Sequence, residues 1–281
     1  MMKKILKISA LLLAGMLCWQ PVSADLFNFG GVRTNIYSFS NKSFEGAESE
    51  TRSMGPINGI SNNGPLNVVF IESDKNEVIV KGDKNLFCRV QTQYKDGIVN
   101  ISLEPGTYRN VWLQVEVYGK TLNTVHCTGS GNFKAESIKT DAEEMGVKVT
   151  GSGVITIGTL TCSRDLDMHV SGSGDIILKK VECKDVDIDV TGSGNVMASE
   201  ISFVDMDADV RGSGDIKLEN IQGNATDMAI AGSGCIRLLG GSINFVKARI
   251  AGSGEIKGHI KYKSIEQKTA GSGCIHLTQD N

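Results

Sequence analysis

The tripeptide Gly-Ser-Gly recurs at a nearly fixed interval, and no other feature of the sequence restricts the fold as strongly. The copies begin at Gly129, Gly151, Gly172, Gly192, Gly212, Gly232, Gly252 and Gly271. The interval from one copy to the next is twenty in most cases and never departs from twenty by more than two. Such a period indicates a stacked array, in which each unit is too short to bury its own apolar residues and must pack on its neighbours.

Apolar residues occupy fixed places within each unit. If Ser171 is place 1, the unit of residues 171–190 has apolar residues at places 6, 8, 11, 13, 16, 18 and 20, and the unit of residues 191–210 fills the same places. A spacing of two indicates β-strands. These places can share one interior only if the chain turns between places 8 and 11, between places 13 and 16, and at Gly-Ser-Gly, where glycine tolerates unusual backbone angles.

The pattern therefore predicts an all-β fold, a single-stranded parallel β-helix (β-solenoid) with about 20 residues per three-sided coil. Coils should stack about 4.8 Å apart. We expect them to be right-handed, because a three-sided hexapeptide coil would need roughly eighteen residues and a stricter sixfold rhythm.

The ends of the chain suggest how it is organised. Residues 1–24 have a basic start, an apolar run and the ending Val-Ser-Ala, which is typical of a secretory signal peptide. Lipid attachment at Cys18 is an alternative, although Leu17 before it fits such a site poorly. We expect a flexible leader over residues 25–54 and one solenoid domain over 55–281, with irregular N-terminal coils at 55–127 that cap the repeats of 128–281.

Composition narrows the classes of partner. The formal net charge of -3 gives no global field that would attract nucleic acid or anionic lipid, and the mature chain has no apolar stretch long enough to span a membrane. Aromatic residues make up only 6% of the chain, so a sugar-stacking platform on the coils is poorly supported. If an aromatic ligand surface exists, it should lie in the N-terminal strands, which contain Tyr94, Tyr108, Trp112 and Tyr118.

Two cysteines share place 13 in neighbouring coils. Cys162 and Cys183 should have Cα atoms about 5 Å apart, which is within disulfide range. Place 13 is also apolar and inward, which favours a ladder of buried free thiols. Both states remain open, with the free thiols favoured.

A column of acids is the most suggestive polar feature. Stacked like charges repel, and a cation such as calcium between their oxygens would remove that cost. These aspartates lie mid-strand on the outward face, however, so hydrated surface carboxylates are the favoured interpretation and calcium the weaker one. The candidates are Asp167, Asp187, Asp207 and Asp227 at place 17, with Asp189 and Asp209 at place 19. No other cofactor is expected.

Catalysis is not expected. Polysaccharide-active β-helices build a cleft from long loops between coils, whereas the intervals here barely change. Gly-Ser-Gly also lacks the Gly-x-Ser-x-Gly frame of a nucleophile elbow. The glycines are therefore interpreted as turns, and no catalytic residue is assigned.

Several motifs occur together in a recognisable order. They are Gly59-Ile60, the run of residues 78–86 (VIVKGDKNL), the run of residues 96–101 (DGIVNI) and the Gly-Ser-Gly-x-Ile coils. In these the chain resembles the auto-transporter adhesin "head GIN" domain family, a domain of unknown function common in Bacteroidetes. The resemblance spans roughly residues 55–277 and implies an exported β-helical domain with an adhesin-like role. It brings no catalytic residues.

Two functions from different classes follow. The first is a non-catalytic protein of the periplasm, cell surface or outer membrane that binds a glycan, matrix or cell-envelope partner. The second is a structural or assembly module that self-associates through the ends of the solenoid, since an open parallel edge invites pairing with another chain. A polysaccharide-active enzyme is a third, weaker alternative.

Overall fold

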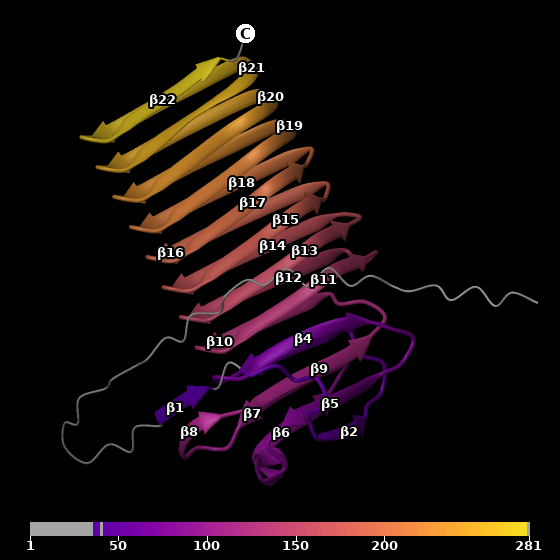
Figure 1. Cartoon of the computed structure of the whole chain (residues 1–281). Helices are drawn as coiled ribbons and strands as arrows, with labels where there is room; N and C mark the ends of the chain where they lie inside the picture. The colour runs from indigo at the N-terminus through magenta and orange to yellow at the C-terminus, as the bar shows by residue number, and fades with distance from the viewer. Residues whose placement is uncertain (1–35, 40–41, 280–281) are drawn as a thin grey trace, which may run out of the picture.

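The fold is a parallel β-solenoid with a strand cap at its N-terminal end (Figure 1). A computed structural model describes residues 36–39 and 42–279 of the chain. The predicted signal peptide, residues 1–24, lies outside the described residues.

The cap consists of short strands and one 3-10 helix from the first half of the chain. Its elements are β1 (Ile36–Phe39), β2 (Ser49–Ser53), β3 (Gly59–Asn63), β4 (Asn67–Glu72), β5 (Glu77–Gly82), η1 (Lys84–Arg89), β6 (Val90–Lys95), β7 (Ile98–Leu103), β8 (Thr107–Val111) and β9 (Leu113–Gly119).

The stack comprises the remaining strands. They are β10 (Thr124–Gly129), β11 (Asn132–Thr140), β12 (Glu144–Gly151), β13 (Val154–Cys162), β14 (Asp165–Gly172), β15 (Asp175–Glu182), β16 (Asp185–Gly192), β17 (Asn195–Ser202), β18 (Asp205–Gly212), β19 (Asp215–Gly232), β20 (Cys235–Gly252), β21 (Glu255–Gly271) and β22 (Cys274–Gln279).

Successive coils pair in parallel and mostly in register, as the repeat predicts. Asp175 pairs with Asn195, which pairs with Asp215, so each place of the coil lies directly on the same place of the next. Two consecutive residues lie outside the core at places 9 and 10, and again at places 14 and 15, and the strand pairing skips place 9. These interruptions are the two predicted corners, and Gly-Ser-Gly is the third.

The core is one continuous cluster of mostly aliphatic side chains inside the coils, built from one stacked column at each inward place. At place 6, every residue from the second repeat to the last complete coil is a fully buried valine or isoleucine. Branched side chains suit this position because they pack well against identical neighbours above and below. The column contains Ile155, Ile176, Val196, Ile216, Ile236 and Ile256.

The Gly-Ser-Gly corners are fastened by main-chain hydrogen bonds. The carbonyl oxygen of Gly151 accepts from the backbone N–H groups of Ser173 (2.8 Å) and Gly174 (2.9 Å) in the following coil, and the arrangement repeats along the stack. The first glycine of all eight copies has a φ between +101° and +140°. From the second copy onward, a Cβ on either glycine would also overlap the carbonyl of the coil below, so the corner excludes side chains for two independent reasons.

This packing predicts that Gly194→Ala destabilises the solenoid. The new methyl group would overlap the carbonyl oxygen of Gly174 and a methyl of Val170. We expect the free energy of unfolding to fall by about 1–3 kcal/mol in chemical denaturation. Ser193→Ala is the matched control, because Ser193 lies in the same corner and is not buried. Equal stability of the two variants would contradict the close-stacked corner.

The predicted capping strands are present, but they do not all wind as further coils. The strands β3 and β4 form a first coil beneath β10 and β11. Below it, β5 pairs antiparallel with β2 and β9, and β6 pairs antiparallel with β7. The strands β7 and β9 continue the parallel pairing beneath β3 and β4, whereas β5 and β6 pair antiparallel, so the expectation of coils throughout residues 55–127 is wrong for β5 and β6.

The interpretation of residues 25–54 as a flexible leader is wrong for two segments. The strand β1 pairs with β8, and β2 pairs with β5. Arg52 on β2 donates hydrogen bonds to the carbonyl oxygens of Phe87 (2.9 Å) and Val90 (2.6 Å). This polar segment is thus fixed by long-range contacts that its composition does not reveal.

Cys162 and Cys183 form a disulfide, with Cα atoms 4.9 Å apart. The expectation of free buried thiols is therefore wrong, while the predicted stacking of the two residues is confirmed. Cys162 is buried and Cys183 only partly so. The disulfide links two adjacent coils.

Alkylation of a chain that begins at Asp25 tests this pairing. Among the described cysteines, Cys88 and Cys274 are exposed and free, whereas Cys127 and Cys235 are buried and free. Burial raises the pKa of the Cys127 thiol to about 12 and also raises the pKa of Cys235, which suppresses the reactive thiolate. Mass spectrometry should show two modified cysteines in the native protein, four after unfolding and six after reduction. Six modified cysteines without reductant would contradict the disulfide.

Candidate functional site

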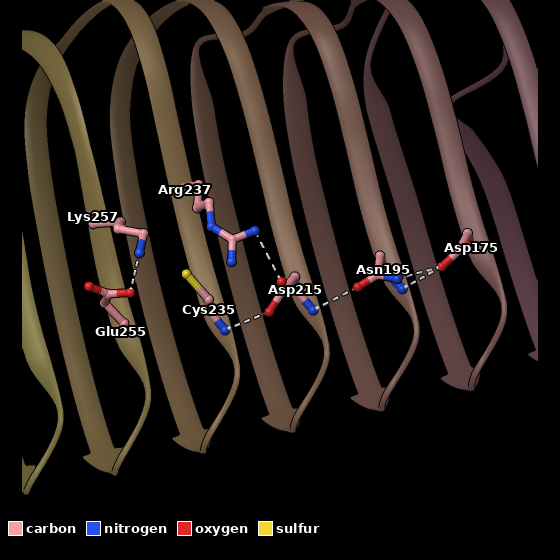
Figure 2. A network of polar contacts seen from close by, with 7 residues as sticks. All are labelled: Asp175, Asn195, Asp215, Cys235, Arg237, Glu255 and Lys257. Atoms are coloured by element: carbon pink, nitrogen blue, oxygen red, sulfur yellow. Dashed lines mark hydrogen bonds and ion pairs between the residues drawn. The ribbon is translucent and has the colours of Figure 1, made fainter.

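A polar ladder follows the Gly-Ser-Gly corner at place 5 (Figure 2). The side-chain Oδ1 atoms of Asp175, Asn195 and Asp215 each accept a hydrogen bond from the backbone N–H of the same place in the next coil, at 3.1, 3.3 and 3.1 Å. Asp215 also forms an ion pair with Arg237. These side chains thus satisfy the main chain beside the turn, so this row has a structural role, in line with the turn preference of Asp and Asn.

The ladder of side-chain acceptors ends at Cys235. Its thiol is a weak acceptor, and it is mostly buried at a place where the preceding coils carry an acid or an amide. In the next coil Glu255 pairs with Lys257 instead of the backbone (2.5 Å). The row therefore offers no uniform line of free oxygens to a ligand.

A second row of acids forms an extended surface on β14, β16 and β18. Strand pairing places Asp167 beside Asp187 and Asp187 beside Asp207, while Asp189 lies beside Asp209. The intervening residues of each strand are buried, so the carboxylates point outward. We call this surface the acidic face; its members are Asp165, Asp167, Asp185, Asp187, Asp189, Asp205, Asp207 and Asp209.

Three members of the acidic face were not singled out from the sequence. Asp165, Asp185 and Asp205 begin the three strands at place 15 and pair with one another in register. The same twenty-residue period marks them, so the spacing alone could have identified them. The predicted column at place 17 is brought together as expected as far as Asp227, which pairs with Asp207.

Positive charges reach only the margins of the acidic face. Arg211 binds Asp189 and Asp209 at 2.5 and 2.6 Å, and Lys184 binds Asp185 at 3.0 Å. Asp227 is held by Lys247 and Arg249. Among the described residues, no ion pair involves the five remaining carboxylates, Asp165, Asp167, Asp187, Asp205 and Asp207.

Partial burial and neighbouring charges perturb the protonation of the face. Desolvation, followed by repulsion from Asp207 and Asp167, raises the pKa of Asp187. Desolvation also raises the pKa of Asp209, although Arg211 opposes that shift. Since a raised pKa means that folding favours the protonated acid, the ionised acidic face weakens the native state at neutral pH.

Asp187→Asn should therefore stabilise the protein at pH 7. The melting temperature should rise by roughly 1–2 °C, and the gain should disappear as the pH falls through the titration range of Asp187. Asp185→Asn is the control, because it removes the partner of Lys184 and should give less stabilisation. Thermal melts of the two variants at pH 7 and pH 4 measure the difference; a loss of stability in Asp187→Asn at pH 7 would contradict the repulsion.

The acidic face does not have the geometry of a metal site. Within the part of the chain that the structure describes, no three His, Cys, Asp or Glu side chains converge on a position that could hold a metal ion. The carboxylates instead lie side by side on a flat sheet, with their separation set by strand spacing. Calcium binding stays a prediction, and this geometry does not favour it.

The N-terminal aromatic residues do not form a common platform. Trp112 stacks on Phe44 with ring centroids 5.4 Å apart, while Tyr94 donates a hydrogen bond to the Pro56 carbonyl. Tyr118 donates to the buried Glu116, and desolvation together with that carboxylate raises the pKa of Tyr118 to about 12. These aromatic side chains therefore have separate structural contacts.

The C-terminal edge of the stack is polar. The strand β22 covers only Glu255–Ile260 of β21, and residues 261–271 have no further strand beyond them among the described residues. At places 18 and 20 of this coil, Gln267 and Thr269 replace the usual apolar residues and are exposed. Lys261, Lys263 and Lys268 lie on the same stretch, a pattern that protects an edge from pairing.

Together these observations define a repeat protein: a parallel β-solenoid with an apolar interior, hydrogen-bonded corners and one strongly acidic outer face. The chain belongs to the family described as "Putative auto-transporter adhesin, head GIN domain", whose model matches residues 57–242 and 199–281. The described part of the chain contains no helix of the length and hydrophobicity that membrane crossing requires.

Solved structures share the fold at low sequence identity. A "putative adhesin" from Parabacteroides merdae has a TM-score of 0.75 at 18% identity, and another from Parabacteroides distasonis has 0.73 at 21%. A "putative lipid binding protein" from Parabacteroides distasonis has 0.74 at 24%. Each alignment covers 85% of this chain and 98% of the other. No curated protein shows a significant match to the sequence.

Proposed function

We propose that this protein is an exported, non-catalytic adhesin that binds a partner of the cell envelope or extracellular matrix on its acidic face. The proposal rests on five carboxylates of the acidic face, which lie on a rigid sheet and form no ion pair with any described residue. Such a surface attracts a complementary partner and sets its orientation.

Elsewhere on the same coils, several charges are paired locally. Lys180 pairs with Glu182 at 2.6 Å, and Lys217 pairs with Glu219 at 2.6 Å, each two places along one strand. A solenoid that served only as a scaffold could use the same arrangement everywhere. Five carboxylates of the acidic face lack such pairs, and desolvation together with repulsion between them raises the pKa of Asp187. Carboxylates that are left unpaired although they weaken the native state support a role in recognition.

Two further features support this assignment. The Cys162–Cys183 disulfide suits an oxidising compartment outside the cytoplasm, consistent with the predicted signal peptide. The polar last coil, with Gln267 and Thr269 at inward places, gives little basis for the alternative of self-association through the solenoid ends.

A solid-phase binding assay tests the proposal. The mature chain, from Asp25 onward, is applied to a glycan array and to plates coated with fibronectin, laminin or collagen. We expect saturable binding to at least one surface and at least a tenfold loss when the five carboxylates without ion pairs are changed together to Asn, because they supply the attraction. Absence of binding to every surface, or equal binding by this variant, would overturn the proposal.

The control removes the same amount of negative charge elsewhere. Changing five outward glutamates on other parts of the solenoid to Gln should leave binding within about twofold, since the attraction is local under salt screening. Suitable positions, all away from the acidic face, are Glu72, Glu136, Glu182, Glu200 and Glu219.

A further inference from the structure

The outer sheet carries different side chains as it nears the C-terminal coils. On β18 and on the second halves of β19, β20 and β21, buried residues alternate with outward ones, and strand pairing sets the outward ones in rows across the four strands. We call this surface the C-terminal patch. Its rows, each read from β18 to β21, are Asp205, Ala225, Phe245 and Ser264; Asp207, Asp227, Lys247 and Glu266; Asp209, Ala229, Arg249 and Lys268; and Arg211, Ala231, Ala251 and Ala270.

The C-terminal patch holds both signs of charge in separate zones. Most of its carboxylates lie on β18 and β19, whereas Lys247, Arg249 and Lys268 lie on β20 and β21. Lys247 and Arg249 share the single carboxylate of Asp227, and within the part of the chain that the structure describes no ion pair involves Lys268. Excess positive charge on β20 and β21 therefore lies beside excess negative charge on β18.

A protruding side chain and a hollow lie next to each other on the patch. Phe245 is 54% exposed and is one of three large apolar side chains that are exposed among the described residues. Its neighbour in the same row is Ala225, and here the surface is hollowed, with a volume of about 410 Å³. Aromatic residues that enter a pocket of a partner are the commonest anchors of protein interfaces.

Small side chains occupy much of the rest of the patch. Ala229 and Ala231 stand at the places that Asp189 and Thr191 hold on β16, and Ala251 follows on β20. Alanine loses no rotamer freedom when it is covered, and its short side chain lets a second surface approach closely. The patch is therefore suited to burial against another sheet of the same kind.

The patch is self-complementary in one orientation. A two-fold axis that runs along the strands between β19 and β20 places β20 of one copy on β19 of a second copy, and β21 on β18. The aromatic ring of each copy then faces the hollow of the other, and the positive zone of each faces negative charge. The opposed pairs, each of which occurs twice, are Phe245 with Ala225, Lys247 with Asp227, and Lys268 with Asp209.

We propose that this protein forms a reversible dimer through the C-terminal patch, in which Phe245 of each copy fills the hollow of the other. The surface is a side of the solenoid and not one of its ends. Four strands about 4.8 Å apart and about 23 Å of their length give an overlap of roughly 900 Å² summed over both copies. Because this area lies at the low end for specific interfaces, the dimer dissociates on dilution.

The dimer goes beyond the proposed adhesin function and leaves a binding surface for it. The overlap does not include β14 and β16, so Asp165, Asp167 and Asp187 of the acidic face stay open to another partner. Two copies joined in this way present two such surfaces, which strengthens attachment to a partner that has several binding sites.

Sedimentation velocity of the chain that begins at Asp25 tests the dimer. The exposed thiols of Cys88 and Cys274 are alkylated first, so that no disulfide joins two copies. Between about 5 and about 300 µM we expect the protein to change from monomer to dimer. Phe245→Ala should raise the dissociation constant at least tenfold, and so should Ala225→Leu, which fills the hollow without altering charge.

Glu266 gives a second test, because the proposed axis places it opposite Asp207 of the second copy. Glu266→Lys turns this contact between like charges into an attraction and should lower the dissociation constant at least threefold. Lys268→Glu should raise it at least tenfold, since it creates repulsion with Asp209. The control Glu200→Lys makes the same change of charge as Glu266→Lys at an exposed position of β17 and should leave the constant within about twofold.

Several outcomes would overturn the inference. They are a monomer at every concentration, an unchanged dissociation constant in both Phe245→Ala and Ala225→Leu, or weaker association in Glu266→Lys. Thermal melts verify that each variant is folded, as expected for outward residues. The matrix and glycan assay does not depend on this result: matrix binding by a monomer would reject only the dimer, and a dimer without matrix binding would reject only the adhesin.

Discussion

The stacking of one Gly-Ser-Gly corner directly on the next is the constraint on which the structure depends. Each first-glycine carbonyl accepts hydrogen bonds from the following coil, and a Cβ at either glycine would separate the coils. Since the corner fixes both the distance between coils and their rotation, every place in the coil repeats directly above itself. A change of chain length between corners must then be absorbed locally, as at β20 and β21, where the pairing shifts after Leu239.

This strict repetition has opposite consequences for different side chains. An isoleucine stacked on an isoleucine extends the core, and an Asp or Asn at place 5 accepts a hydrogen bond from the coil above it. At place 17, Asp187 stacks between Asp167 and Asp207 without such a partner, and desolvation together with their charges raises its pKa. The acidic face is therefore the part of the repeat where stacking weakens the fold, while Ala225 and Phe245 interrupt the regular surface beside it.

The family relationship explains the architecture better than it explains the partner. The solved relatives have between 18 and 24% identity, so their similarity shows a shared fold. A solenoid interior needs only apolar side chains of suitable size at the inward places. The outward places are free of that restriction, so binding chemistry is decided by residues such as Asp207 and Phe245, which the fold does not require.

The sequence alone determined the solenoid, the three corners and the inward places, because a local rule repeated every twenty residues leaves few other ways to bury the apolar side chains. It also located the column from Asp167 to Asp227. Only the tertiary structure paired β2 with β5 and formed the antiparallel cap, since these depend on contacts that the period does not specify. The period placed Cys162 beside Cys183, and the structure decided that their sulfur atoms are bonded. The tertiary structure likewise decided which carboxylates have cationic partners and where a hollow opens, because both follow from side chains that different coils bring together in space.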